Sequence, residues 1–193
     1  KAPFEGEDFQ MFERDLPGQN KAGYSADAEI SALPLESCET MNNTWGYNIN
    51  DRNFKSTKQL IHTLVGAAGN NANLLLNVGP RPGGDFPEGS VRHLKEIGEW
   101  MRTYGETIQG TRAGIIPQQD WGVTTQKGNK LYIHILNLNK TELLLPTTDR
   151  KIKSIVCFKD QIPVKYKKTK EGILLQLNEV PTDIDHIVEI IWK

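Results

Sequence analysis

The chain has 193 residues, of which 37% are hydrophobic and 24% are charged, so it can bury the core of one large domain or two modest ones. Its formal net charge of −1 argues against a nucleic-acid-binding protein, which would normally carry a basic face. No apolar run is long enough to span a bilayer, so membrane insertion is not expected.

The first fifty residues are rich in turn-forming and acidic residues and contain only short apolar patches. We interpret them as loops around one or two short strands. Residues 1–8 include no initiator Met and no apolar signal-peptide core, so we expect that they come from the interior of a longer protein.

Two segments combine polar and aromatic residues in the way that a ligand pocket requires. Residues 36–48 bring carboxylates, amides and an indole close together and bend at residues 45–47 (Trp-Gly-Tyr). Residues 73–80 form a short apolar run that ends in Asn77 and a Gly-Pro turn, which is typical of a buried parallel strand whose carboxyl end opens onto a site. Together they predict a pocket for a polar ligand with one apolar face, such as a sugar.

A helix is predicted between these two segments. Ser56 and Gln59 form a capping box, and the apolar residues after them recur at three- and four-residue spacing on one face. The left-handed conformations that residues 69–71 (Gly-Asn-Asn) favour end this helix. A strand over residues 72–78 is expected to follow directly.

A second helix is predicted after the loop that follows this strand. Pro87 suits its first turn, and Gly105 ends it. Its apolar stripe consists of Val91, Leu94, Ile97, Met101 and Tyr104. Helix, strand, loop and helix in this order are typical of an α/β barrel or a layered α/β sheet.

Beyond about residue 112 the pattern changes to short alternating or β-branched runs that turn residues separate. The seven predicted strands cover residues 121–126, 130–137, 142–145, 152–158, 164–167, 173–177 and 186–192. No helical period lies between them, which is typical of an antiparallel β-sandwich. We therefore predict the C-terminal part of an α/β domain over residues 1–111 and a β-sandwich domain over residues 112–193.

The cysteines and histidines give no sign of cross-links or of a metal centre. Cys38 and Cys157 lie far apart in regions of different predicted structure and are expected to be buried or half-buried thiols. The histidines lack metal-ligand spacing, and no cysteine adjoins them, so no metal site is expected. They are His62, His93, His134 and His186.

Four segments, in order and at compatible spacing, resemble the C-terminal half of the family 29 glycoside hydrolases, the α-L-fucosidases. They are residues 36–41 (Glu-Ser-Cys-Glu-Thr-Met), 45–47 (Trp-Gly-Tyr), 73–80 (Asn-Leu-Leu-Leu-Asn-Val-Gly-Pro) and 98–111, which begins Gly-Glu-Trp. The resemblance covers roughly residues 8–112. It implies the C-terminal portion of a (β/α)8-like barrel followed by an antiparallel β-sandwich.

The resemblance also implies an activity: exo-acting, retaining hydrolysis of terminal α-L-fucose by double displacement, with no cofactor. In the family, the nucleophile is an Asp on an earlier barrel strand, so the expected partners are a fucosylated glycan and the N-terminal remainder of the barrel. A periplasmic or secreted location, or a lysosomal one in a eukaryote, would follow.

Two site residues are implied by position. The segment Asp8–Glu13 has the form Asp-Phe-x-x-x-Glu, whose Glu is the acid/base in many members, so Glu13 is the candidate catalytic residue. Apolar neighbours such as Phe9, Met11 and Phe12 are expected to raise its pKa by desolvation. Glu36 is the second candidate, and we expect it to bond backbone or arginine groups beneath the site instead.

Trp45 corresponds to the aromatic residue that, in the family, lines the pocket around the methyl group of fucose. An apolar wall for that methyl group and polar partners for the hydroxyls suit a deoxy sugar. Met41 and Tyr47 are expected to serve packing. Asn77 is expected to bond neighbouring loops.

A different class of function is a non-catalytic module in which residues 113–193 bind glycans. This hypothesis requires exposed aromatic residues on one face of the sandwich. The available rings are Trp121, Tyr132, Tyr166 and Trp192. Most of them lie in alternating runs that favour an inward ring, so a sandwich that stabilises the barrel is the third reading.

Overall fold

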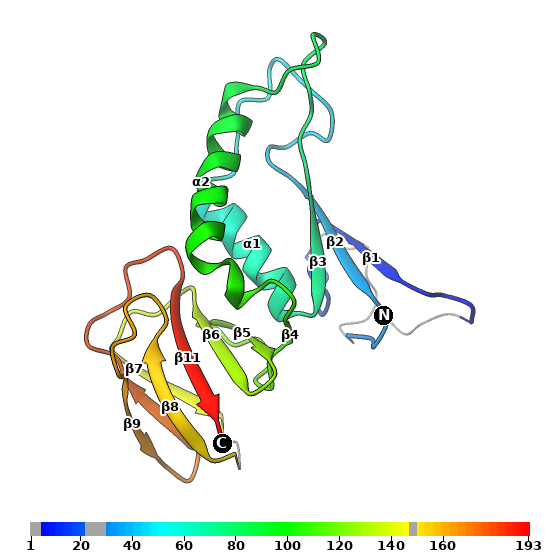
Figure 1. Ribbon diagram of the computed structural model, residues 1–193. Coiled ribbons are helices and arrows are strands. Elements are labelled where there is room, and N and C mark those ends of the chain that lie inside the picture. The colour runs from blue at the N-terminus through cyan, green and yellow to red at the C-terminus, as the bar shows by residue number, and fades with distance from the viewer. Residues whose placement is uncertain (1–4, 22–29, 147–149) are drawn as a thin grey trace. The chain divides into compact units, whose positions relative to one another are not determined.

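The computed structural model describes residues 5–21, 30–146 and 150–193 (Figure 1). The chain divides into two compact units, Lys1–Gly105 and Glu106–Lys193. This division falls a few residues before the boundary at 111/112 that the sequence suggests. No helix among the described residues is long and apolar enough to cross a membrane.

The first unit is built on a three-stranded parallel sheet. Its strands β1 (Gln10–Glu13), β2 (Leu35–Thr40) and β3 (Ala72–Asn77) lie side by side in that order (Figure 1). The register pairs Glu13 with Cys38 and Cys38 with Leu75. Since all three strands run in the same direction, their carboxyl ends meet at one edge of the sheet.

Helix α1 (Thr57–Gly69) connects β2 to β3 and begins with the predicted capping box. The backbone N–H of Gln59 donates to the hydroxyl of Ser56 at 3.2 Å, and the Gln59 side chain accepts from the Ser56 N–H at 2.8 Å. After the helix, Asn71 has a φ of +62°, in the left-handed region that ends helices. Both predicted ends of this helix are confirmed.

The sheet has one covered and one open face. Phe12, Leu35 and Ser37 are buried on the face that α1 covers, where α1 packs against β3. Because successive side chains of a strand alternate, Met11, Glu13 and their neighbours on the other strands lie on the opposite face. Met11 and Leu75 on that face are exposed. Among the described residues, the second face therefore lacks the cover that parallel sheets normally have.

Helix α2 (Glu88–Tyr104) packs against α1, but not through the predicted stripe (Figure 1). Its buried residues are Ser90, His93 and Trp100, while Leu94 of the predicted stripe is exposed. His93 explains why a different face of α2 is buried: its Nδ1 atom lies 2.8 Å from the hydroxyl of Thr57 on α1, and its ring contacts the Phe54 ring in a tilted arrangement with 6.1 Å between the ring centres. The polar contact with α1 sets the buried face.

The second unit contains two antiparallel sheets. A short 3-10 helix, Gly105–Thr107, spans the boundary between the two units. The five-stranded sheet has the order β4 (Arg112–Ala113), β5 (Gly122–Lys127), β6 (Lys130–Ile135), β11 (His186–Trp192) and β8 (Ile152–Cys157). The three-stranded sheet has the order β7 (Glu142–Pro146), β10 (Gly172–Gln176) and β9 (Lys165–Lys168). All seven predicted strands are confirmed, and β4 is an additional short strand.

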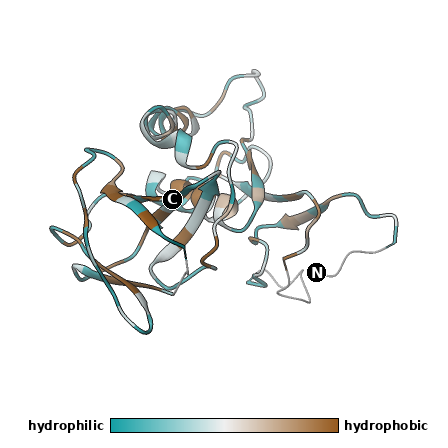
Figure 2. Ribbon diagram, turned by 60° about the horizontal axis from the view of Figure 1, so that its bottom comes forward, coloured by the Kyte–Doolittle hydropathy of each residue, from teal (hydrophilic) through white to brown (hydrophobic). Residues whose placement is uncertain are grey.

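One hydrophobic core unites these two sheets. Leu131 and Ile133 of β6 belong to the same buried cluster as Leu143 of β7 and Leu175 of β10. Figure 2 shows the alternation of hydrophobic and hydrophilic residues along the strands that makes such a core possible. The cluster contributes the main stabilisation of this unit, because burial of apolar side chains is the dominant favourable term in folding.

The aromatic rings of this unit lie mostly inside it. Trp121, Tyr132 and Trp192 are buried, whereas Tyr166 on β9 is exposed. A single exposed ring among these four does not form the aromatic face that a glycan-binding sandwich would need. The observation weighs against the binding-module hypothesis and favours a stabilising role.

Candidate functional site

The candidate site lies at the edge of the parallel sheet where β1, β2 and β3 end, and in the loop that follows β2. Glu13, Thr40 and Asn77 are the last residues of these strands. The loop from Met41 to Ser56 contains Trp45 and the other polar and aromatic residues of the second half of the predicted pocket segment.

Asn77 attaches this loop to the end of β3. Its amide nitrogen donates to the carbonyl of Trp45 at 2.6 Å and to the hydroxyl of Thr40 at 3.2 Å. Gly79 permits the close approach, since a Cβ atom there would lie 2.6 Å from the backbone nitrogen of Tyr47. The prediction that Asn77 bonds a neighbouring loop is confirmed, and the bond fixes the backbone of Trp45.

Asp51 organises the first half of the loop. Its Oδ2 atom accepts hydrogen bonds from the backbone N–H groups of Asn43 and Thr44, both at 2.9 Å, and from the Asn42 amide at 3.0 Å. Desolvation, the largest single influence, would raise the pKa of Asp51, but hydrogen bonds from Asn53 and Thr44 outweigh it and lower the pKa below 3.8. The carboxylate therefore stays charged and holds the loop.

We predict that Asp51→Asn loosens this loop. The amide keeps one acceptor but loses the charge that strengthens each bond, so hydrogen exchange at the Asn43 and Thr44 amides should accelerate about five- to tenfold. In the wild-type chain their protection should be present above pH 3.8 and be lost as the pH falls through the lowered pKa. Asp120→Asn, at an exposed turn of the second unit, is the control. Unchanged exchange at both amides in Asp51→Asn would contradict the role.

Arg14 connects the end of β1 to the same loop. Its φ of +57° is unusual for a residue with a side chain, and its N–H donates to the carbonyl of Cys38 at 2.8 Å. Its guanidinium donates to the carbonyl of Asn43 at 2.8 Å and lies 5.2 Å from the centre of the Trp45 ring. This contact places Arg14, the residue that follows Glu13 at the carboxyl end of β1, against Trp45.

Glu13 is exposed on the open face of the sheet and makes no hydrogen bond or ion pair to another described residue. The strand register places Glu13 next to Cys38. Burial raises the pKa of the Cys38 thiol, and the charge of Glu13 raises it further. The expected apolar enclosure of Glu13 is absent within the described part of the chain. Phe12 faces the other side of the sheet, and Met11 is exposed.

The other predicted residues have mixed outcomes. Glu36 is half-buried on the same face as Glu13, but it forms none of the expected hydrogen bonds with described residues. Met41 is buried in the core, as predicted. Tyr47, predicted to serve packing, is instead exposed and lines a pocket. Trp45 is half-buried, so part of its ring is accessible.

The sequence interpretation missed Arg14, Asp51 and Lys55 as organisers of the site. The ammonium group of Lys55 donates to the carbonyl of Thr40 at 2.7 Å and pairs with Glu39 at 3.2 Å. A lone Asp in a loop of Asn and Thr residues is a weak signal of such a role, because its side chain can accept from nearby backbone N–H groups. Arg14 and Lys55 act through backbone carbonyls that only the folded sheet brings to them.

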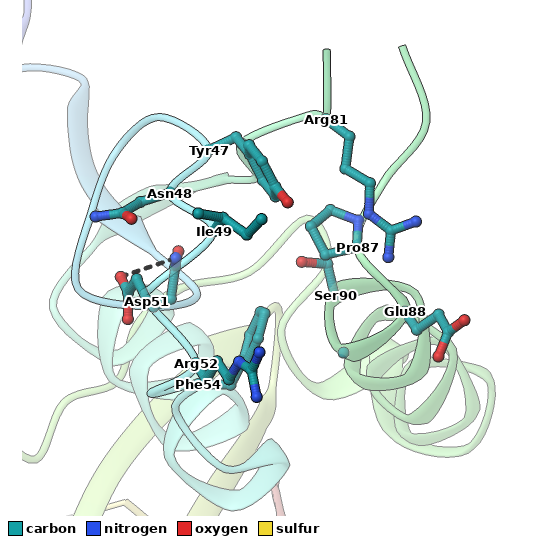
Figure 3. Close-up of a pocket in the computed structure, with 13 residues that line it drawn as sticks. Tyr47, Asn48, Ile49, Asp51, Arg52, Phe54, Arg81, Pro87, Glu88 and Ser90 are labelled. Atoms are coloured by element: carbon teal, nitrogen blue, oxygen red, sulfur yellow. Dashed lines mark hydrogen bonds between the residues drawn. The ribbon is translucent and has the colours of Figure 1, made fainter. Parts of the chain in front are cut away.

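A separate pocket of about 530 Å³ lies beside this loop in the first unit (Figure 3). The loop after β2 lines it with Tyr47 and Ile49, and the start of α2 lines it with Ser90. It is distinct from the contact between Arg14 and Trp45, neither of which lines it. Within the described residues, no group of three or more His, Cys, Asp or Glu side chains is arranged to hold a metal ion.

Comparison with known proteins gives consistent results. The model of the α-L-fucosidase family matches residues 1–106. The α-L-fucosidase of Dictyostelium discoideum is 25% identical over 122 residues, which are 61% of this chain and 26% of that protein. The structure of α-L-fucosidase isoenzyme 1 from Paenibacillus thiaminolyticus is 32% identical with a TM-score of 0.81, covering 96% of this chain and 45% of that one.

A third match concerns the fold alone. A family 29 α-L-fucosidase from Bacteroides thetaiotaomicron, 20% identical, has a TM-score of 0.82 over 95% of this chain and 43% of that one. That enzyme was trapped as a covalent intermediate with 2-fluoro-fucosyl fluoride, using a Glu-to-Gln mutant. The chain spans about a quarter of the matched curated relative and less than half of the two solved structures.

Proposed function

Because the chain belongs to the α-L-fucosidase family, we propose that it forms the C-terminal part of a (β/α)8-like catalytic barrel and a following β-sandwich in a retaining α-L-fucosidase. The complete enzyme would remove terminal α-L-fucose from glycans. The observation that carries the proposal is the position of Glu13 at the open edge of the sheet, next to the Arg14 side chain that contacts Trp45.

The sheet supports the barrel. Three parallel strands with α1 on one face are what a segment of a (β/α)8 barrel contains, with the helices outside. The open face, with Met11, Glu13 and Leu75, would then point toward the barrel axis. Active sites of such barrels lie at the carboxyl ends of the strands, which is where Glu13 and the loop of Trp45 are.

In the proposed reaction Glu13 is the acid/base. It would protonate the departing glycosidic oxygen in the first step and deprotonate the incoming water in the second. The nucleophile would be the Asp of an earlier barrel strand, as the family resemblance implies, at the roughly 5–5.5 Å separation that retaining enzymes use. The covalent intermediate trapped in the Bacteroides thetaiotaomicron enzyme supports this two-step route.

Trp45 is proposed to give the apolar wall for the fucose methyl group. Its ring is held from one side by the Arg14 guanidinium, and its backbone is held by Asn77. A half-buried ring fixed at two points is suited to a precise contact, because little conformational entropy is lost when the sugar binds. The second unit, with its aromatic rings mostly buried, is proposed to stabilise the barrel.

The stereochemistry of hydrolysis tests the proposal. Proton NMR of the complete enzyme acting on 4-nitrophenyl α-L-fucoside should show α-L-fucose as the first product, with the β anomer appearing only by mutarotation. Mass spectrometry after incubation with 2-fluoro-fucosyl fluoride should show one added 2-fluoro-fucosyl group. Release of β-L-fucose first would exclude double displacement, and no release from the α-fucoside would exclude the activity.

A further inference from the structure

The pocket beside the Trp45 loop has a lining rich in hydrogen-bond donors (Figure 3). One wall is the amino end of α2, a helix of 17 residues. Pro87 is its N-cap and makes no side-chain cap bond. The first bond within the helix runs from the N–H of Val91 to the carbonyl of Pro87 at 3.1 Å. The N–H groups of Glu88, Gly89 and Ser90 therefore have no acceptor within the helix.

Ser90 is an independent sign that this end of the helix meets a ligand. The residue is only 3% exposed, and its hydroxyl makes no hydrogen bond to a described residue. Figure 3 shows this hydroxyl directed into the pocket, toward Ile49. Because this oxygen is not one of the fully buried atoms that lack a partner, it opens onto the pocket, where a bound group can accept from it. The open side of the pocket is where that group would come from.

Two arginines add positive charge to the lining. Arg81 pairs with Asp85 through Nη1 at 2.9 Å, which leaves other guanidinium N–H groups free to bind, and Arg52 forms no ion pair with a described residue. The lining also contains the carboxylates of Asp51 and Glu88, so its formal charges balance, and the placement of these two carboxylates decides what an anion in the pocket would meet. Asp51 is already occupied by four donors to Oδ2, and Figure 3 shows the carboxylate of Glu88 directed away from the pocket.

We propose that this pocket binds an oxyanion, the carboxylate or sulfate group of an acidic sugar. The uncapped N–H groups, the Ser90 hydroxyl and the Arg81 guanidinium would donate to its oxygens, and the positive end of the helix dipole favours the charge. Tyr47 and Ile49 offer an apolar surface for the sugar ring. That the carrier is a sugar rests on the proposed function, since the pocket adjoins the loop of Trp45.

Titration of the full chain with fucose-free probes tests the inference. Calorimetry with glucuronic acid, galactose 6-sulfate and neutral galactose should show that at least one acidic sugar binds about tenfold or more tightly than galactose, because charge-assisted hydrogen bonds are stronger. The acidic probe that binds more tightly identifies the group as carboxylate or sulfate ester. Its affinity should fall as salt is raised.

Variants locate the binding. Ser90→Ala and Arg81→Gln should each lower the affinity for the acidic probe about three- to tenfold. Arg102 is an exposed arginine in the last turn of the same helix, and Arg102→Gln should leave that affinity unchanged. Circular dichroism should show that all three fold. Equal binding of the acidic and neutral sugars, or an equal loss in Arg102→Gln, would overturn the proposal. Glu13→Ala should not change this binding, so loss of the proposed catalytic function would leave the result intact.

Discussion

Glu13→Ala in the complete enzyme is expected to lower kcat/KM for fucosides with poor leaving groups by about 10²- to 10⁴-fold, the usual contribution of a general acid. Such substrates need a proton on the departing oxygen, and the proposed donor is Glu13, the last residue of β1, which precedes the Arg14 that contacts Trp45. The aryloxide of an activated aryl fucoside departs without being protonated, so kcat/KM for such substrates should change much less.

The second step of the reaction makes the same variant sensitive to azide. Without Glu13 no carboxylate activates the incoming water, so the fucosyl–enzyme intermediate should accumulate and limit kcat for aryl fucosides. Azide needs no base, and it should restore turnover and give a fucosyl azide of retained configuration. Steady-state kinetics on both substrate types, with and without azide, measure this.

Glu36→Ala is the matched control for Glu13→Ala. Both glutamates lie on the open face of the sheet, on neighbouring strands, but Glu36 is farther from the carboxyl edge. We expect a loss below about tenfold on either substrate type and no effect of azide, because Glu36 does not lie at the strand end where the proposed proton transfer takes place. Equal losses of Glu13→Ala on poor and activated substrates, without rescue, would remove Glu13 from the acid/base role.

Elements that depend on local signals were predictable from the sequence. The capping box of Ser56 and the left-handed Asn71 fix the ends of α1 through contacts within a few residues. The strands of the second unit follow from alternating apolar residues between turns, a pattern that needs no knowledge of the partner strand. Trp45 and Glu13 were selected by family resemblance, since an exposed Glu beside an Arg is chemically unremarkable by itself.

Features that depend on contacts between distant residues were not predictable in this way. The prediction of the buried face of α2 from its apolar stripe was wrong, because the contact between His93 and Thr57 joins two helices. The stacking of Arg14 on Trp45 requires the parallel pairing of β1 with β2, which no local pattern specifies. Tyr47 was assigned to packing because an aromatic residue in a sequence shows nothing of which side of a loop it occupies.

The second unit contains a buried pair that no catalytic role explains. Nδ1 of His134 lies 2.8 Å from Oδ2 of Asp185, and Nε2 lies 3.2 Å from the hydroxyl of Thr125. That hydroxyl also donates to the carbonyl of Thr107. Both side chains of the pair are fully buried, and Oδ1 of Asp185 has no hydrogen-bond partner in the described chain.

Asp185→Ala should therefore lower the free energy of unfolding of the second unit by about 3–5 kcal/mol, because it leaves His134 buried without its partner. Asp185→Asn should lower the free energy of unfolding less, by about 1–2 kcal/mol, since an amide side chain can still form a hydrogen bond with Nδ1. Hydrogen exchange of β6 and β11 amides in rising urea reports on this unit alone. Asp183→Ala is the control: it is two residues away but half exposed, pairs with Lys159 at 3.7 Å, and should change stability by less than about 1 kcal/mol. If Asp183→Ala and Asp185→Ala destabilise the unit equally, the pair of His134 and Asp185 makes no specific contribution to stability, and the hydrophobic core between the two sheets stabilises the unit without it.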